Sequence, residues 1–404
     1  MIDVDVDAEG RRLLAFARRA RMDGVGFGWL DARGAIDPTQ GVHTWVTARM
    51  THVFALAALR DEPAALELAG HGVASLLSGP LRDPQHGGWL GSVTETGSAH
   101  SVDKLAYDHA FVVLAAASAV AASVPDADTL LDDAVKIFDR HFLDGDGRVV
   151  DSYPQDFSAP EPYRGANSSM HTVEALLALG DVRSEPARHR AALAIADHLV
   201  HQMAVGRGGR LPEHFDADWV PLPDYHSDHR DDPFRPYGVT PGHLFEWSRL
   251  LLQLEAVLQD PPGWLLADAR LLFRVAVDIG WSVDGRPGIV YTTDWNDAPV
   301  VRRRMHWVHA EAVAAAAALA ARTGDAEYEV WERAWWKYIW TNFVDDRDEH
   351  EGNWRHELDA DNRPVSRTWS GRPDVYHAYQ ALLLSRYPSG ASLAQRLGGP
   401  TEPA

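Results

Sequence analysis

Histidine and glutamate recur in pairs at the beginnings of helical segments. His171 and Glu174 are three residues apart, and so are His243 and Glu246. Residues at this spacing lie on one face of a helix, so each imidazole can share a proton with a carboxylate. Imidazole titrates near neutral pH, which suits it to general acid/base catalysis. The pairs therefore predict proton-transfer chemistry, although an isolated pair of this kind more often caps a helix at the surface.

Further clusters of polar and aromatic residues occupy comparable places in otherwise apolar segments. These clusters are Trp45 with Arg49, Tyr107 with His109, His306, Trp307 and His309 with Glu311, and Asp374 with His377. Together with the two pairs they recur about every 67 residues, six times along a chain of 404 residues. Imidazole at the same helical phase in four of the six units, with arginine and tyrosine in the other two, favours one shared site over unrelated surface pairs.

The elements that position these clusters are helices. Apolar residues recur at intervals of three and four, as at Leu250, Leu251, Leu254 and Val257. Strand-like runs are scarce, and the best two, 288–293 and 148–153, are short enough to be hairpin arms. The expected helices are 8–22, 43–59, 62–78, 103–122, 127–142, 168–180, 186–204, 241–259, 264–280, 306–323, 326–343 and 373–387.

Each cluster begins an Ala/Leu-rich helix that is followed by a more charged helix of similar length. The repeating unit is therefore a helical hairpin, and six hairpins can close into a double ring with the apolar helices inside. The predicted fold class is all-α. All six inner helices would then begin at one face, where their free backbone N–H groups add positive partial charge to a single funnel.

No domain linker is evident, so residues 1–404 are expected to form a single domain. The longest irregular segment, 206–240, contains five prolines and comes just before the His243 cluster. A loop of that length inside a compact domain is usually a lid or a binding loop. Asn167 comes just before its expected helix, where it either caps the helix or belongs to the site.

The composition excludes several classes of protein. The absence of cysteine excludes disulfides, thiolate zinc sites and iron–sulfur clusters, and the net charge of −20 disfavours nucleic acids and anionic membranes as partners. The acidic start MIDVDVDAEG does not resemble a signal peptide, and no apolar stretch of about 18 residues follows, so we expect a cytoplasmic protein. The 15 Trp and 20 His suit sugar binding and proton transfer, with packing as the alternative reason.

Metal and nucleotide motifs are weak or missing. The chain has no HExxH motif, and the histidines of the 226–229 segment lie in an acidic loop. Asp144–Gly147 resembles part of a calcium loop but lacks its downstream glutamate, so a simple turn is favoured. Gly24–Gly28 lacks the strand and the lysine of a nucleotide loop. The sequence therefore predicts neither a metal site nor a cofactor.

Four segments of the chain resemble the N-acylglucosamine 2-epimerase superfamily. They are Arg164–His171 (RGANSSMH), Thr240–Trp247 (TPGHLFEW), Trp307–Ala312 (WVHAEA) and Pro373–Ala378 (PDVYHA). The resemblance extends over essentially the whole chain. The last two segments are most similar to the branch that contains the mannose and sulfoquinovose isomerases.

The resemblance implies an (α/α)6 barrel and cofactor-independent proton transfer on an open-chain sugar. It implies that His377 is the principal base, which moves a proton between C2 and C1 through an enediol. His243 would support ring opening and supply the second acid/base, and Glu246 and Glu311 would orient or polarise the two imidazoles. The residues that the resemblance assigns to sugar binding are Arg49, Trp45, Tyr107, Asn167, His171, Glu174 and Trp307.

The first hypothesis is an aldose–ketose isomerase that converts D-mannose to D-fructose, with D-lyxose as a slower substrate. A sulfoquinovose isomerase is an alternative if Arg164, Arg235 or Arg302 binds a sulfonate. A 2-epimerase would instead return the proton to the opposite face of C2. A glycoside hydrolase needs two carboxylates and no histidine pair, and a sugar-binding protein has little need for four histidines. The expected partner is a monosaccharide, and the chain is expected to be a monomer or a small homo-oligomer.

Overall fold

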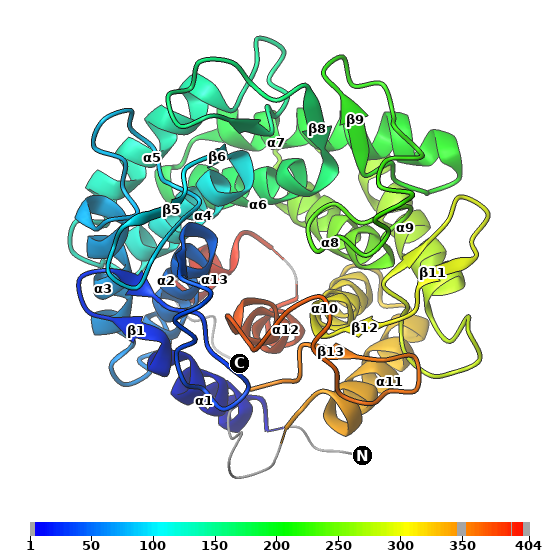
Figure 1. Ribbon diagram of the computed structural model, residues 1–404. Coiled ribbons are helices and arrows are strands. Elements are labelled where there is room, and N and C mark those ends of the chain that lie inside the picture. Colours follow the sequence, from blue (N-terminus) through cyan, green and yellow to red (C-terminus); the bar gives the residue numbers. More distant parts are fainter. Residues whose placement is uncertain (1–4, 346–352, 389, 399–404) are drawn as a thin grey trace.

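Six helices form the inner ring of a barrel, seen end-on in Figure 1. The structure is a computed structural model that describes residues 5–345, 353–388 and 390–398. The inner helices are α2 (Thr44–Ala58), α4 (Ala106–Ala121), α6 (Ala166–Arg183), α8 (Pro241–Val257), α10 (His306–Thr323) and α12 (Tyr376–Arg386). Neighbours pack together around the ring, which closes where α12 contacts α2. Nearly every residue of these helices is buried, as expected for helices that are apolar on all sides.

A second ring of helices surrounds the first. Its members are α1 (Val6–Ala17), α3 (Ala65–Ser78), α5 (Ala127–His141), α7 (Pro186–Ala196), α9 (Trp264–Gly280) and α11 (Ala326–Asn342). These helices bury one stripe each: in α5, Leu130, Ala134 and Phe138 are buried, whereas Asp132 and Asp139 on the other face are exposed. The all-α (α/α)6 barrel expected from the repeat is confirmed. No helix in the described part of the chain is both long and apolar enough to cross a membrane.

The sixth hairpin is assembled from the two ends of the chain. No outer helix follows α12 in the described residues; instead α1 packs against it. Nε1 of Trp354 donates to Oε1 of the buried Glu9, 2.9 Å away, and this bond ties the first helix to the C-terminal part. A short helix that the sequence did not predict, α13 (Leu393–Gly398), contacts α2, α4 and α6.

Some helices begin or end at residues other than those predicted, and the local structure explains each difference. The first helix ends at Ala17 because Arg18–Ala20 form a 3-10 turn (η1) that leads into a strand. The expected helix 186–204 is α-helical only to Ala196, then π-helical over Asp197–Ala204 (η2), with a 3-10 turn at Val205–Arg207 (η3). The expected start at residue 103 is too early, because a strand lies directly before α4.

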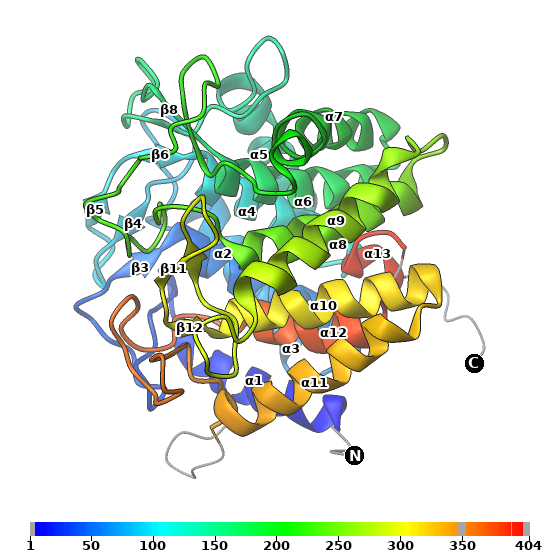
Figure 2. The same ribbon diagram turned by 90° about the vertical axis from the view of Figure 1, so that its right-hand side faces the viewer.

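Short strands gather with the long loops at one end of the barrel, as Figure 2 shows. Residues 288–293 and 148–153 are extended only at their last two residues. The antiparallel pairs are β1 (Arg21–Met22) with β2 (Gly26–Phe27), β3 (Val42–His43) with β4 (Ser92–Val93), β4 with β5 (Ala99–Ser101), β6 (Lys104–Leu105) with β7 (Ser152–Tyr153), β8 (Tyr163–Gly165) with β9 (His214–Asp216), β10 (Thr292–Thr293) with β11 (Pro299–Val301), and β12 (Arg304–Met305) with β13 (Glu357–Leu358).

These strands fix where the inner helices begin. Strands β3, β6, β8 and β12 each run directly into the first residue of an inner helix. Each of these four strands pairs with a strand from another loop. The start of each helix is therefore held by the strand pair that precedes it as well as by the helix itself. The first turns of the inner helices therefore occupy defined positions at this end of the barrel.

Candidate active site

A pocket opens at the end of the barrel where the inner helices begin. Nine of the predicted site residues line it, and they come from all six inner helices. These nine residues are Trp45, Arg49, Tyr107, Asn167, His171, His243, Glu246, Trp307 and His377. The other two predicted residues, Glu174 and Glu311, lie behind the wall and contact the histidines that line it. The ring thus brings together residues as far apart in the sequence as Trp45 and His377.

His377 is held by a carboxylate from the neighbouring helix. Its Nδ1 lies 2.8 Å from Oε1 of Glu311 in α10, and both side chains are buried. Burial lowers the pKa of His377, and the nearby Glu311 carboxylate acts in the opposite direction. The bond places the ring proton on Nδ1, so Nε2 carries the lone pair that a general base needs.

His243 is paired with a carboxylate that the sequence did not indicate. Its Nδ1 lies 2.9 and 3.0 Å from the two carboxylate oxygens of Glu213, which comes from the loop just before β9. The expected partner on the same helical turn, Glu246, is wrong for this role. Glu213 stands in a segment without helical periodicity, so nothing in its spacing linked it to His243.

Trp307 packs against both imidazoles. Its ring centre is 5.3 Å from that of His243 and 5.7 Å from that of His377. Gly242 makes this packing possible, because a Cβ at that position would lie 2.5 Å from the indole. The two histidines and the indole form one wall of the pocket. The indole provides an apolar face, and the two imidazoles provide proton-accepting groups next to it.

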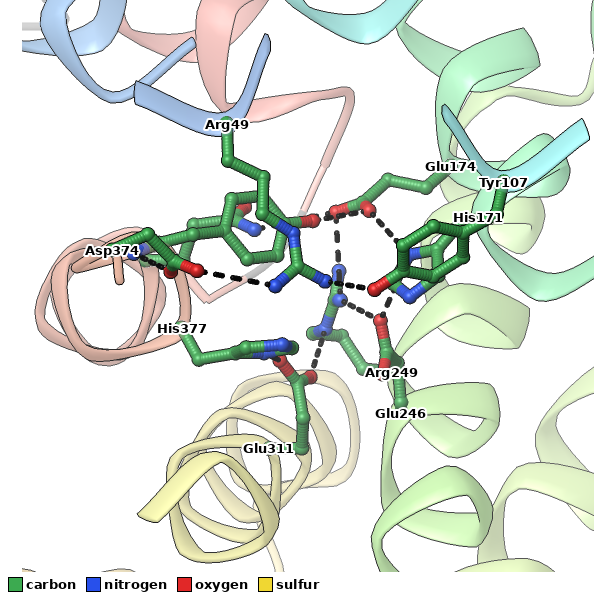
Figure 3. Close-up of polar contacts among 11 residues, drawn as sticks. Arg49, Tyr107, His171, Glu174, Glu246, Arg249, Glu311, Asp374 and His377 are labelled. Atoms are coloured by element: carbon green, nitrogen blue, oxygen red, sulfur yellow. Dashed lines mark hydrogen bonds and ion pairs between the residues drawn. The ribbon is translucent and has the colours of Figure 1, made fainter. Parts of the chain in front are cut away.

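Three glutamates surround one buried arginine beneath the pocket, as Figure 3 shows. Nε of Arg249 lies 3.0 Å from Glu311, and its terminal nitrogen lies 3.4 Å from Glu246 and 3.6 Å from Glu174. All four side chains are buried. Sequence reasoning missed Arg249, although an arginine inside the apolar run of α8 was a usable signal. The arginine holds Glu311 in the position from which Glu311 contacts His377.

The three carboxylates beneath the pocket differ in their tendency to bind a proton. Burial, together with the charge of Glu311, raises the pKa of Glu246 well above its ordinary value. For Glu174, hydrogen bonding by His171 and the charge of Arg249 outweigh burial and lower the pKa. Glu174 also accepts hydrogen bonds from the hydroxyl of Tyr376 and the amide of Gln380. Of these three carboxyl groups, Glu246 is therefore the one that most readily carries a proton.

Arg49 is fixed on the opposite side of the pocket. It donates to the hydroxyl of Tyr107 over 2.7 Å and is paired with Asp374 over 3.4 Å. Its guanidinium lies 4.3 Å from the ring centre of Phe111 and 4.7 Å from that of Tyr376. A guanidinium held in this way presents its charge without the entropy cost of ordering a flexible side chain.

His171 and Asn167 come from the first turns of α6. Nδ1 of His171 lies 3.4 Å from Oε2 of Glu174, as the pair predicted, and burial lowers the pKa of His171 to about 4. Asn167 is the second residue of α6, after a cap at Gly165, and it lines the pocket. The question that the sequence left open for Asn167 is settled: it is not the helix cap.

His109 and His309 do not belong to the site. In each, Nδ1 donates to the carbonyl four residues earlier, and Nε2 accepts a backbone N–H from the preceding loop. Burial lowers the pKa of both histidines to about 3. They are therefore structural residues that join a loop to an inner helix, and counting His309 among the site imidazoles was wrong.

The segment 206–240 contributes to the pocket, as its position before His243 suggested. Pro233, Phe234 and Pro236 line it, and the ring of Phe234 packs against Trp45, Tyr107 and Trp369. Further lining residues that the sequence did not single out for the site are Tyr291, His356, Trp369 and Pro373. They come from loops, where no periodic pattern shows which side chain faces inward.

The three arginines considered as ligands for a sulfonate form hydrogen bonds or ion pairs with other groups of the protein. Arg164 donates to the carbonyls of Glu161 and Tyr163. Arg235 is paired with the carboxylate of Glu161 and lies over the ring of Tyr163, and Arg302 is paired with Asp284. None of the three is among the residues that line this pocket.

Two groups of potential cation ligands are already engaged within the protein. Ligand atoms of His171, Glu174 and Glu246 lie within 4.8 Å of one another, but the guanidinium of Arg249 already lies among these carboxylates. A cation there would compete with that charge. Asp144 forms a turn in which its carboxylate accepts the N–H groups of Asp146 and Arg148, so the simple turn is confirmed for this segment.

A barrel of helical hairpins with two carboxylate-bound imidazoles in one pocket defines an enzyme that moves protons on a small polar substrate. The family model described as N-acylglucosamine 2-epimerase (GlcNAc 2-epimerase) matches residues 26–381, and the chain belongs to this family.

Named relatives are similar over almost their whole length. A D-mannose isomerase of Thermobifida fusca is 53% identical over 97% of this chain and 96% of that protein. Another from Pseudomonas cannabina pv. alisalensis is 49% identical over 97% of this chain and 94% of that protein. A crystal structure of D-mannose isomerase matches with a TM-score of 0.87 at 26% identity, over 96% of this chain and 98% of the other. The chain is therefore an isomerase.

Proposed function

We propose that this chain interconverts D-mannose and D-fructose, with D-lyxose as a slower substrate. The observation that carries the proposal is the pair of imidazoles, His377 and His243, which both pack against Trp307 and each have a carboxylate at Nδ1. Relatives named D-mannose isomerase at 49% and 53% identity support the same substrate. No arginine beyond Arg49 lines the pocket in the described part of the chain, which supports an uncharged sugar.

In the proposed reaction, His377 removes the proton from C2 of the open-chain aldose. The electron pair moves into the C1–C2 bond and an enediol forms. His377 then delivers the proton to C1, and the ketose results. Glu311 holds the ring and its tautomer and stabilises the imidazolium that forms between the two transfers.

His243 also packs against the indole. It assists opening of the sugar ring and exchanges protons with the oxygens at C1 and C2. Glu213 holds its tautomer in the way that Glu311 holds that of His377. Glu246, which we expected to orient His243, instead lines the pocket beside Arg249 and His171. In this position its carboxyl group faces the substrate rather than His243.

The remaining residues of the pocket bind the sugar. Arg49, Tyr107, Asn167 and His171 contact hydroxyl groups, and Arg49 stabilises negative charge on the enediolate oxygen. Trp45 and Trp307 provide apolar faces, and Glu174 fixes His171. The segment 206–240 acts as a lid, because Phe234 lies over Trp45 and Tyr107 at the pocket and is 41% exposed.

Proton NMR with D-mannose in D2O tests the function directly. The purified protein should convert mannose to fructose with deuterium at the reacting carbon, without added nucleotide or metal. Glucose as the main early product would show a 2-epimerase instead. Unchanged mannose, with turnover of sulfoquinovose, would contradict the proposed substrate.

Replacing Trp307 tests whether its indole contributes to sugar binding, measured by KM, more than to the chemical step, measured by kcat. We expect Trp307→Ala to raise KM for D-mannose by about tenfold, because an apolar ring face is lost, and to change kcat less. Steady-state kinetics measure both constants. Trp264→Ala, at the start of the outer helix α9 and outside the pocket, is the control and should leave both unchanged. An unaltered KM in Trp307→Ala would contradict the stacking role.

A further inference from the structure

Two histidines of the pocket wall form a stacked pair that the proposed mechanism does not use. His306 is the first residue of α10, and its backbone N–H donates to the carbonyl of His356 over 3.0 Å. The two rings are nearly parallel, with centres 3.9 Å apart at an angle of 19°. Both side chains are buried and both line the pocket. The ring centre of His306 is 6.4 Å from that of His377, so the pair lies beside the proposed base.

The contacts of the two rings fix their tautomers. Nδ1 of His306 lies 3.3 Å from the carbonyl oxygen of His356, and the ring of His356 is hydrogen-bonded to the backbone of Asp374. A carbonyl oxygen only accepts, so the nitrogen that faces it carries the hydrogen in each ring. Nε2 is then a bare acceptor in both rings. Neither Nε2 has a hydrogen-bond partner within the part of the chain that the structure describes.

Both rings are uncharged near neutral pH. Burial lowers the pKa of His306 to about 3, and the charge that His377 gains on protonation acts in the same direction. Burial and the proximity of His306 lower the pKa of His356 well below its ordinary value. The pair therefore holds two lone pairs and no positive charge within the pocket wall, where both Nε2 atoms have almost no exposed surface. A buried acceptor without a partner is costly, so a ligand with O–H donors would be favoured there.

We propose that His306 and His356 select the substrate by accepting hydrogen bonds from hydroxyl groups on the part of the sugar that does not react. This inference rests on the proposed function and specifies its substrate class: a sugar with free hydroxyl groups and no anionic substituent. A hydroxyl can donate to Nε2, whereas a sulfonate or phosphate oxygen has no hydrogen to donate and meets a lone pair. The histidine pair discriminates between ligands by whether a ligand group can donate a hydrogen bond to Nε2, rather than by the size of the ligand.

The test measures kcat/KM of the wild type and of His306→Leu with D-mannose and with its 3-deoxy, 4-deoxy and 6-deoxy analogues. We expect the wild type to lose about tenfold on the analogue that lacks the bound hydroxyl, the worth of one buried hydrogen bond. His306→Leu should lose about tenfold on D-mannose and nothing further on that analogue. This non-additivity identifies the hydroxyl that contacts the ring. Most of the loss should be in KM.

Two further variants serve as controls: one keeps a hydrogen-bond acceptor at position 306, and the other changes a histidine outside the pocket. His306→Gln keeps an acceptor near the position of Nε2 and should recover part of the loss on D-mannose. His100→Leu replaces an exposed histidine of β5, outside the pocket and the 206–240 segment, and should behave as the wild type. If His306→Leu does not fold, His306→Gln and His356→Gln are compared across the same sugars.

An equal loss on D-mannose and all three analogues, in every folded variant, would overturn the inference. The proposed function is judged separately, by turnover of D-mannose in the wild type. Wild-type turnover of D-mannose combined with equal losses in the variants refutes only the role of the histidine pair. The absence of wild-type turnover refutes the proposed function itself.

Discussion

His377→Asn is expected to lower kcat for D-mannose by about a thousandfold, within the range that a general acid/base contributes. The asparagine amide can still donate to Glu311 from near the position of Nδ1, where His377 and Glu311 are now 2.8 Å apart. It offers no basic nitrogen in place of Nε2. The variant therefore removes the proton acceptor while it keeps the buried carboxylate satisfied, and kcat and the unfolding midpoint are measured together.

The unfolding midpoint of His377→Asn should stay close to that of the wild type. The matched control is His100→Asn, at an exposed imidazole in β5, which should keep full activity. A His377→Asn protein that remains fully active would eliminate His377 as the base. A protein that loses activity and stability together would point to a structural role for His377, and the assignment would pass to His243.

The barrel and the location of the site could be predicted because both follow from regular patterns. The apolar run from Ala312 to Leu319 requires a buried helix, and six such helices must begin at one face if the ring closes. Residues on the first turns then meet in space whatever their separation in the sequence. For this reason Arg49, His171 and His377 were identified although no local motif connects them.

The errors concern the direction in which a side chain points from its helix and the residue that it contacts. A sequence repeat specifies neither of these. Successive residues of a helix are rotated by about 100°, so His309 points about 200° away from Trp307 and leaves the pocket. Residue His109 differs from Tyr107 in the same way. The partner of His243 is Glu213, which stands in a loop, whereas Glu311, which the resemblance had implied as an orienting carboxylate, does contact His377. Such contacts depend on how the elements are packed together.

Arg249→Leu is expected to destabilise the folded protein by about 3–5 kcal/mol at pH 7.5, the usual cost of removing one partner from a buried ionic group. Arg249 is 4% exposed and lies 3.0 Å from Glu311, with Glu246 and Glu174 within 3.6 Å. Without the guanidinium, the two ionised carboxylates, Glu174 and Glu311, are left buried beside Glu246 with no cation among them. Chemical denaturation of the variant and the wild type measures the difference.

The same variant should recover stability, relative to the wild type, as the pH falls. Loss of Arg249 raises the pKa values of the three carboxyl groups in the folded protein above those in the unfolded chain, so the folded state binds more protons. Stability then rises on acidification through that range, because protonation neutralises the uncompensated charges. We expect the deficit at pH 5.5 to be smaller than at pH 7.5.

Arg322→Leu provides the matched control for Arg249→Leu. Arg322 is 48% exposed and its carboxylate partner is Glu255, so its removal should cost about 1 kcal/mol or less at either pH. An Arg249→Leu protein as stable as this control would show that the carboxylates of the cluster are already protonated in the wild type. A deficit that does not change with pH would show that packing, not charge, is what Arg249 contributes. The expected pattern, a large deficit at pH 7.5 that shrinks at pH 5.5, would establish that Arg249 holds Glu174 and Glu311 ionised beneath the pocket and thereby keeps Glu311 able to orient His377.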